Sequence, residues 1–108
     1  MKERKITELL KENTRIYFWL CDKDTEKRFL RDATAQGFRF ADGVKPTRRK
    51  ADSIMAINND LTINYVGYIG HIAFMGAETI DEKTLLRVDY KKFADGCDNY
   101  IYSNEKKI

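Results

Sequence analysis

Residues 16–21 form an unbroken run of six apolar side chains, which predicts a strand in the interior of a sheet. Successive side chains of a strand point to opposite faces, so an unbroken apolar run indicates that both faces are covered. The two expected sets are Ile16, Phe18 and Leu20 on one face, and Tyr17, Trp19 and Cys21 on the other.

A helix is predicted to begin near Asp24 and to end at Gly37, because glycine adopts the left-handed conformation of a helix C-terminus most easily. Its apolar face would carry Phe29, Leu30 and Ala33. Two carboxylates are candidates for accepting hydrogen bonds from the first turn, Asp22 and Asp24.

The spacing of apolar residues, which repeats every two residues in a strand and about every 3.6 in a helix, assigns secondary structure to most of the remaining chain. The predicted elements are a short amphipathic helix over residues 3–13, strands at 38–40, 53–58, 61–68, 85–90 and 100–102, an exposed loop at 44–52, a polar connection at 76–83, and a turn or one short helical turn at 91–96. The apolar run from Tyr65 to Phe74 would read as a long strand but for Gly67 and Gly70, which indicate a bulge, a tight bend or a close backbone approach.

This order of elements predicts a single α+β domain over residues 1–108, with a frayed tail at 103–108. We expect a mostly antiparallel sheet of about five strands. An N-terminal helix and one strand–helix–strand unit would accompany it, with the helices on one face of the sheet.

Composition narrows the class of protein. The chain has 108 residues, of which 43% are hydrophobic and 34% charged, as is usual for a soluble globular domain. No apolar run approaches the ~20 residues that span a bilayer, and the N-terminus lacks the apolar core of a signal peptide. Two cysteines, Cys21 and Cys97, fit free thiols. We therefore expect a cytoplasmic protein that does not contact membranes.

Catalysis and cofactor binding have little support in the sequence. Cys21 and His71 could form a thiol and base pair, but the carboxylate of Asp22 would oppose a thiolate, and burial as a small apolar residue explains Cys21 more simply. The sole histidine and two unrelated cysteines have no zinc spacing, and no glycine-rich phosphate-binding motif is present. We expect no catalytic residue, no metal and no cofactor.

Binding is better supported, by a basic cluster and by an excess of aromatic residues. The net charge of +3 is small, but four cations lie close together in the 44–52 loop. Thirteen aromatic side chains exceed what a small core hides, and tyrosine and arginine are the usual anchors of protein interfaces. The predicted partner-binding residues are Lys45, Arg48, Arg49, Lys50, Tyr65 and Tyr68.

The segment EKRFLRDATAQGFRFADGVKPT, after the strand IYFWLC and before MAINNDLTINYVGYIGHIAF, resembles small accessory proteins of phages and integrative elements of Firmicutes. In these proteins a strand precedes a helix of the form FLxxAxxxGFRFxDG. Some small proteins of the same genetic neighbourhoods inhibit host defence, including anti-CRISPR proteins. The resemblance implies an origin and a style of function, and it transfers no catalytic or binding residue.

The leading expectation is a non-catalytic, anti-CRISPR-like inhibitor that docks on a host protein, such as a nucleic-acid-processing defence protein, through the basic loop and exposed aromatics. The first alternative is a small nucleic-acid-binding module that adds Arg28, Arg31 and Arg39 to the loop. The second is a small enzyme or signalling-nucleotide binder that uses Tyr68 and His71. A monomer and a homodimer are both compatible with the sequence.

Overall fold

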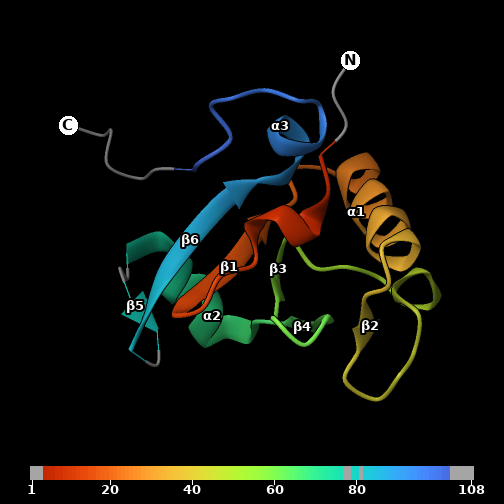
Figure 1. Cartoon of the computed structure of the whole chain (residues 1–108), viewed down its shortest axis with the longest axis horizontal. Coiled ribbons are helices and arrows are strands. Elements are labelled where there is room, and N and C mark those ends of the chain that lie inside the picture. The colour runs from red at the N-terminus through yellow and green to blue at the C-terminus, as the bar shows by residue number, and fades with distance from the viewer. Residues whose placement is uncertain (1–3, 77–78, 81, 103–108) are drawn as a thin grey trace.

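The computed structural model describes residues 4–76, 79–80 and 82–102, which fold around a six-stranded sheet (Figure 1). The strand order is β2-β4-β3-β1-β6-β5. The strands are β1 Thr14–Trp19, β2 Arg39–Phe40, β3 Ile54–Ile57, β4 Thr62–Tyr65, β5 Thr79–Ile80 and β6 Lys83–Asp89. The α-helices are α1 Lys23–Ala35, α2 Gly67–Gly76 and α3 Tyr90–Ala94, and the 3-10 helices are η1 Ile6–Leu9 and η2 Pro46–Arg48.

The α+β class is confirmed, but the expectation of a mostly antiparallel sheet is only partly right. β1 pairs in parallel with β6, and β2 with β4, whereas the other neighbouring strands are antiparallel. Hydrophobic periodicity gives the length and the covered face of a strand. It carries no information on whether two neighbouring strands run parallel or antiparallel, which for β1 depends on its pairing with the distant β6.

Both faces of β1 are covered, as its unbroken apolar run predicts. Ile16, Phe18 and Leu20 belong to a core cluster that includes Phe29 of α1 and Tyr90 of α3. On the opposite face, Tyr17 and Trp19 pack in a second cluster around Ile54, Ala56, Phe74 and Leu85. Phe74 lies in α2, so the expectation that the helices share one face is wrong. Cys21 is exposed instead of completing the second face, because β1 ends at Trp19.

α1 is formed as predicted, with Phe29, Leu30 and Ala33 buried. Asp22 is its N-cap, and the Thr25 backbone N–H donates to Asp22 Oδ1 over 2.8 Å. The chain leaves the helix through Gly37, whose φ of +91° is the left-handed conformation that glycine permits.

The predicted hairpin is present as β3 and β4, but the second strand, expected over 61–68, ends at Tyr65. The apolar run that follows is the helix α2, which begins at Gly67, and not an interrupted strand. Gly67 has a φ of +71°, which turns the chain out of β4. Gly70 lacks a side chain where one would meet Val66, since a Cβ there would lie 2.3 Å from that of Val66. Apolar residues on all sides of α2 hide its period from the sequence.

The ends of the chain follow the predictions in part. The helix expected over 3–13 is only the single turn η1, which buries Ile6 and Leu9. β6 and α3 lie where a strand and a helical turn were predicted, and Val88 forms an antiparallel bridge with Ile101. The predicted frayed tail at 103–108 lies outside the described residues. Among the described helices, none has the length and apolar character needed to cross a membrane.

Candidate partner-binding surface

The basic segment 45–50 is held against α1. Pro46 is buried in η2, and the Thr47 N–H donates to Thr34 Oγ1 over 3.2 Å. The Thr34 hydroxyl in turn donates to the Leu30 carbonyl oxygen of α1. The segment therefore presents its cations from a defined backbone, which lowers the ordering cost of binding.

An aromatic and cationic stack fixes the far end of this segment. The Arg49 guanidinium lies 4.6 Å from the centroid of the Phe40 ring, and the Tyr65 ring stacks on Phe40 with centroids 5.5 Å apart. The Tyr65 hydroxyl donates to the Lys50 carbonyl oxygen over 2.6 Å. Arg49 also forms an ion pair with Asp42 at 2.6 Å, and this hydrogen bond lowers the pKa of the Asp42 carboxyl.

A groove of about 420 Å³ runs between α1 and this segment, and we call it the basic groove. Its residues are Lys23, Glu26, Lys27, Leu30, Thr47, Arg49, Lys50 and Ala51. Leu30 and Ala51 supply apolar surface, and the four cations outnumber Glu26, whose carboxylate is 3.7 Å from the Lys23 ammonium. The groove thus combines an apolar contact area with a net positive rim.

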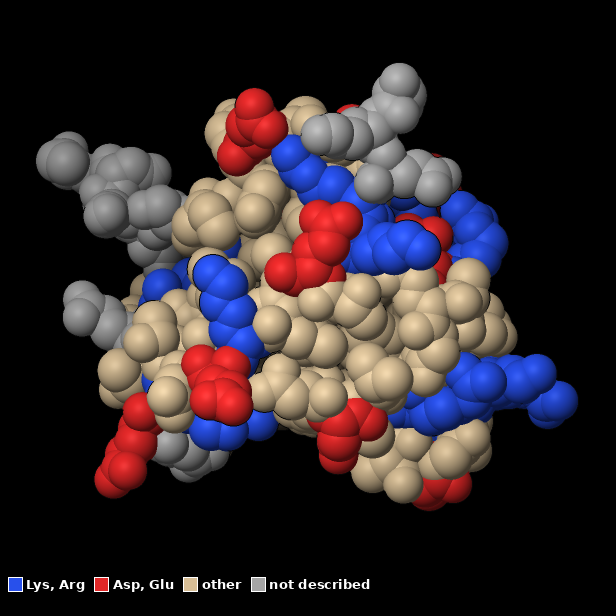
Figure 2. All heavy atoms as spheres, viewed as in Figure 1, with Lys and Arg blue, Asp and Glu red and all other residues tan. Residues whose placement is uncertain are grey.

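A shallower hollow of about 250 Å³ lies on the other side of Arg49 and is lined by Phe40, Asp42, Ile63 and Tyr65 among others. Arg49 lines both depressions. Figure 2 shows basic side chains toward the edge of the molecule where Figure 1 places α1 and the segment after β2.

The structure brings together only part of the predicted site. Arg49, Lys50 and Tyr65 lie side by side, whereas Lys45 and Arg48 are exposed on the same segment without lining the groove. Tyr68 is exposed on α2, on a separate surface.

The residues of this surface that the sequence did not identify include Lys23 and Lys27 of α1, and Phe40. The i, i+4 spacing of Lys23 and Lys27 beside the apolar stripe was the available signal for the two lysines.

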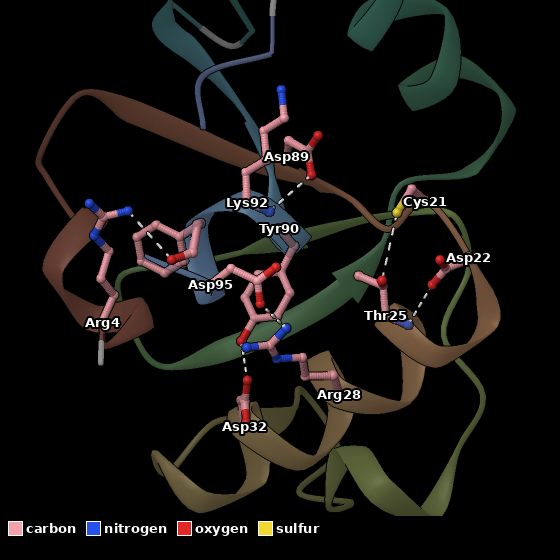
Figure 3. A network of polar contacts seen from close by, with 11 residues as sticks. Arg4, Cys21, Asp22, Thr25, Arg28, Asp32, Asp89, Tyr90, Lys92 and Asp95 are labelled. Atoms are coloured by element: carbon pink, nitrogen blue, oxygen red, sulfur yellow. Dashed lines mark hydrogen bonds and ion pairs between the residues drawn. The ribbon is translucent and has the colours of Figure 1, made fainter. Parts of the chain in front are cut away.

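A second cavity, of about 490 Å³, has residues from the opposite side of α1 and is also basic. It is lined by Arg4, Lys5, Arg28, Arg31, Asp32, Ala35, Gln36 and Ala94. Several of these side chains already have partners, among them Arg4, which forms an ion pair with Asp98 at 3.0 Å, and two that Figure 3 also shows. Arg28 lies 2.6 Å from Asp95, a contact that raises the arginine pKa, and Asp32 accepts from the Tyr90 hydroxyl over 2.5 Å.

The nucleic-acid alternative needs Arg28 and Arg31 to join the basic loop, together with Arg39. Arg28 and Arg31 line the second cavity instead of the basic groove. The Arg39 guanidinium donates to the carbonyl oxygen of Phe38. The proposed set is therefore divided among three places.

Cys21 and His71 each have another partner. The Cys21 Sγ lies 3.6 Å from Thr25 Oγ1, and His71 Nε2 lies 3.5 Å from Asp52 Oδ2.

No hydrogen bond in the described part of the chain joins the thiol to the imidazole, and Cys21, His71 and Tyr68 line none of the three depressions above. Among the described residues, no group of three histidine, cysteine or acidic side chains is arranged to hold a metal ion.

Comparisons with protein families, with curated proteins and with solved structures found no match to this chain.

Proposed function

We propose that this chain is a non-catalytic binding protein whose basic groove receives an acidic segment of a partner protein. The observation that carries the proposal is the composition of the groove, in which four cations surround the apolar surface of Leu30 and Ala51. A narrower proposal, that the partner is a host defence protein which the chain inhibits, rests on the resemblance of residues 26–47 to accessory proteins of mobile elements.

Energetics favour a segment that is both acidic and apolar. An exposed ion pair contributes at most about 1 kcal/mol, so charge alone would give orientation and a fast association rate more than affinity. A leucine-sized side chain removed from water contributes roughly 2 kcal/mol. We therefore expect a partner segment whose carboxylates flank one or two aliphatic side chains, seated on Leu30 and Ala51.

The proposal is tested by titrating the ¹⁵N-labelled chain with a peptide of alternating glutamate and leucine. The amide resonances of Lys27, Thr47 and Lys50 should shift. Lys27→Glu removes one attraction and adds a like-charge repulsion, so it should weaken binding about tenfold, ~1.4 kcal/mol. Lys83→Glu is the matched control, because Lys83 lies on β6 and does not line the groove. Binding that is unaffected by Lys27→Glu would refute the groove as the site.

Cys21→Ala separates binding from catalysis. Cys21 does not line the groove, so the variant should bind the peptide as the original chain does. If Cys21→Ala abolished the biological activity while peptide binding remained, the enzyme alternative would replace this proposal.

A nucleic-acid-binding module remains the second candidate, because α1 contributes an exposed cation to each depression, Lys27 to the basic groove and Arg31 to the second basic cavity. Single-stranded DNA would then shift resonances in both places, and its affinity would fall steeply with added salt. The peptide proposal predicts shifts in the groove alone and no mobility change for DNA.

A further inference from the structure

We propose that the exposed face of α2 is a dimer interface that binds the same face of a second copy of this chain. This apolar face consists of Tyr68, Ile69, Ile72 and Met75, whose exposed fractions are 80%, 76%, 54% and 58%. Side chains of this size are normally covered, and a contiguous exposed group of them marks an interaction site.

α2 is apolar on two opposite sides. Phe74 and Gly70 are buried toward the sheet, and Phe74 packs in the cluster around Tyr17 and Leu85. The apolar face lies on the other side of the helix, because its residues follow the i, i+1, i+4, i+7 spacing of one helical stripe. The sheet explains the burial of Phe74, whereas the side chains of the stripe are exposed to solvent.

The position of α2 is secured independently of that occupant. Arg87 of β6 donates hydrogen bonds to the carbonyl oxygens of Ala73 and Phe74, at the end of the helix where a positive charge is favourable. His71, in the middle of the helix, lies 3.5 Å from Asp52. The apolar face is therefore presented by a helix that the rest of the fold already holds.

The absence of charged side chains on α2 permits a second copy as the occupant. None of the ten residues from Gly67 to Gly76 is a lysine, arginine, aspartate or glutamate, so two copies of this helix can approach without like-charge repulsion. The basic groove and the second cavity are both cationic and would repel themselves. The absence of lysine and arginine in α2 also disfavours a membrane surface, since interfacial helices usually carry these residues on their polar side.

The face is also self-complementary about a two-fold axis. Ile72 lies near the middle of the stripe, so antiparallel packing would place Ile72 against its own counterpart and Tyr68 with Ile69 against Met75 of the second copy. One aromatic and three aliphatic side chains from each copy would bury on the order of 1,000 Å² in total, which reaches the lower limit for specific interfaces.

The test is the mass of the full chain in solution, measured by light scattering across a dilution series. The chain should have twice its monomer mass of 12.7 kDa, and Ile72→Glu should reduce the mass to that of one chain. Leu61→Glu is the matched control, because Leu61 is also an exposed large aliphatic residue but lies in the β3–β4 turn, and this variant should remain dimeric. Circular dichroism would establish that both variants are folded.

Cross-linking provides a second measurement that requires no disruptive substitution. In a Cys21→Ser, Cys97→Ser background, Ile72→Cys should form a disulfide-linked dimer on mild oxidation, and Leu61→Cys should not. A monomeric original chain overturns the proposal, and so does a dimer whose mass Ile72→Glu leaves unchanged. A monomer that sediments with phosphatidylcholine vesicles would overturn it and assign the face to lipid.

This inference is independent of the peptide proposal, because the two surfaces share no residue. Lys27→Glu should reduce peptide binding without changing the mass, and Ile72→Glu should change the mass without reducing peptide binding.

Discussion

The hydroxyl group of Tyr90 donates a hydrogen bond to the Asp32 carboxylate over 2.5 Å and so joins α3 to α1. The Tyr90 ring also contacts Phe18 and Phe29, with ring centroids 4.9 and 5.3 Å away. Burial, followed by the hydrogen bond to Asp32, raises the pKa of Tyr90 far above its ordinary value of 10.0. Tyr90 thus connects the core cluster around Phe18 and Phe29 to Asp32, which lines the second basic cavity.

Tyr90→Phe keeps the ring and removes the hydrogen bond, so we expect a loss of about 2 kcal/mol in the free energy of unfolding at neutral pH. Because the raised pKa favours the protonated folded state, this contribution is complete below pH 10 and declines as the pH rises above it. Urea unfolding at several pH values should show the difference between the two chains narrowing above pH 10. A constant difference would contradict the assignment.

Asp22 is predicted to make the stability of α1 depend on pH at the acid end. Hydrogen bonds from the Thr25 side chain and then from its backbone N–H lower the pKa of Asp22 below its ordinary value of 3.8. The stabilisation is therefore present above pH 3.8 and lost as the pH falls through the lowered pKa. Asp22→Ala should lower the melting temperature at pH 7.

The matched variant is Asp22→Asn, because asparagine keeps the accepting oxygen and has no charge to titrate. It should melt above Asp22→Ala at neutral pH and lose less stability than the original chain on acidification. Equal melting temperatures for the two variants would argue against the cap.

Gly70→Ala is predicted to destabilise α2 even though alanine is the better helix former. The gain in helix propensity is about 1 kcal/mol, whereas a Cβ placed 2.3 Å from that of Val66 forces a displacement that typically costs about 1–3 kcal/mol. Gly76→Ala is the control, because a Cβ there meets nothing within 4 Å. Thermal unfolding should rank Gly70→Ala below both the original chain and Gly76→Ala.

Tyr65→Phe is predicted to loosen the basic segment. It removes the hydrogen bond to the Lys50 carbonyl oxygen and retains the stack on Phe40, so the cost in stability should be about 1 kcal/mol. Amide hydrogen exchange between residues 45 and 50 should become faster, and peptide binding weaker. Tyr68→Phe should change neither, because no hydrogen bond of the Tyr68 hydroxyl to another described residue is found. Equal exchange in the two variants would contradict this role for Tyr65.

Several parts of the fold followed from the sequence because their signals are local. The unbroken apolar run in β1 predicted a strand covered on both faces. The apolar face that contains Phe29 predicted the helix α1, and Asp22 and Gly37 predicted its two ends. Each of these features depends on residues within a few positions of one another, so periodicity and capping chemistry are sufficient.

The sequence predicted only some of the residues of the candidate site. Arg49, Lys50 and Tyr65 were predicted from residue type, but their union around Phe40 depends on β2 lying beside β4, a pairing between residues more than twenty positions apart. Lys23 and Lys27 belong to the same surface because the hydrogen bond from Thr47 to Thr34 holds the basic segment against α1.

The sequence by itself determined which segments of this chain would be apolar, basic or capped. The tertiary structure alone decided that β6 runs parallel to β1, that α2 is a helix on the opposite face from α1, and that the cations of α1 face those of residues 49–50. The physical reason is that apolar burial is non-directional. It requires only that a side chain leave water. The packing of the whole chain settles which distant segment covers that side chain and in which direction the segment runs.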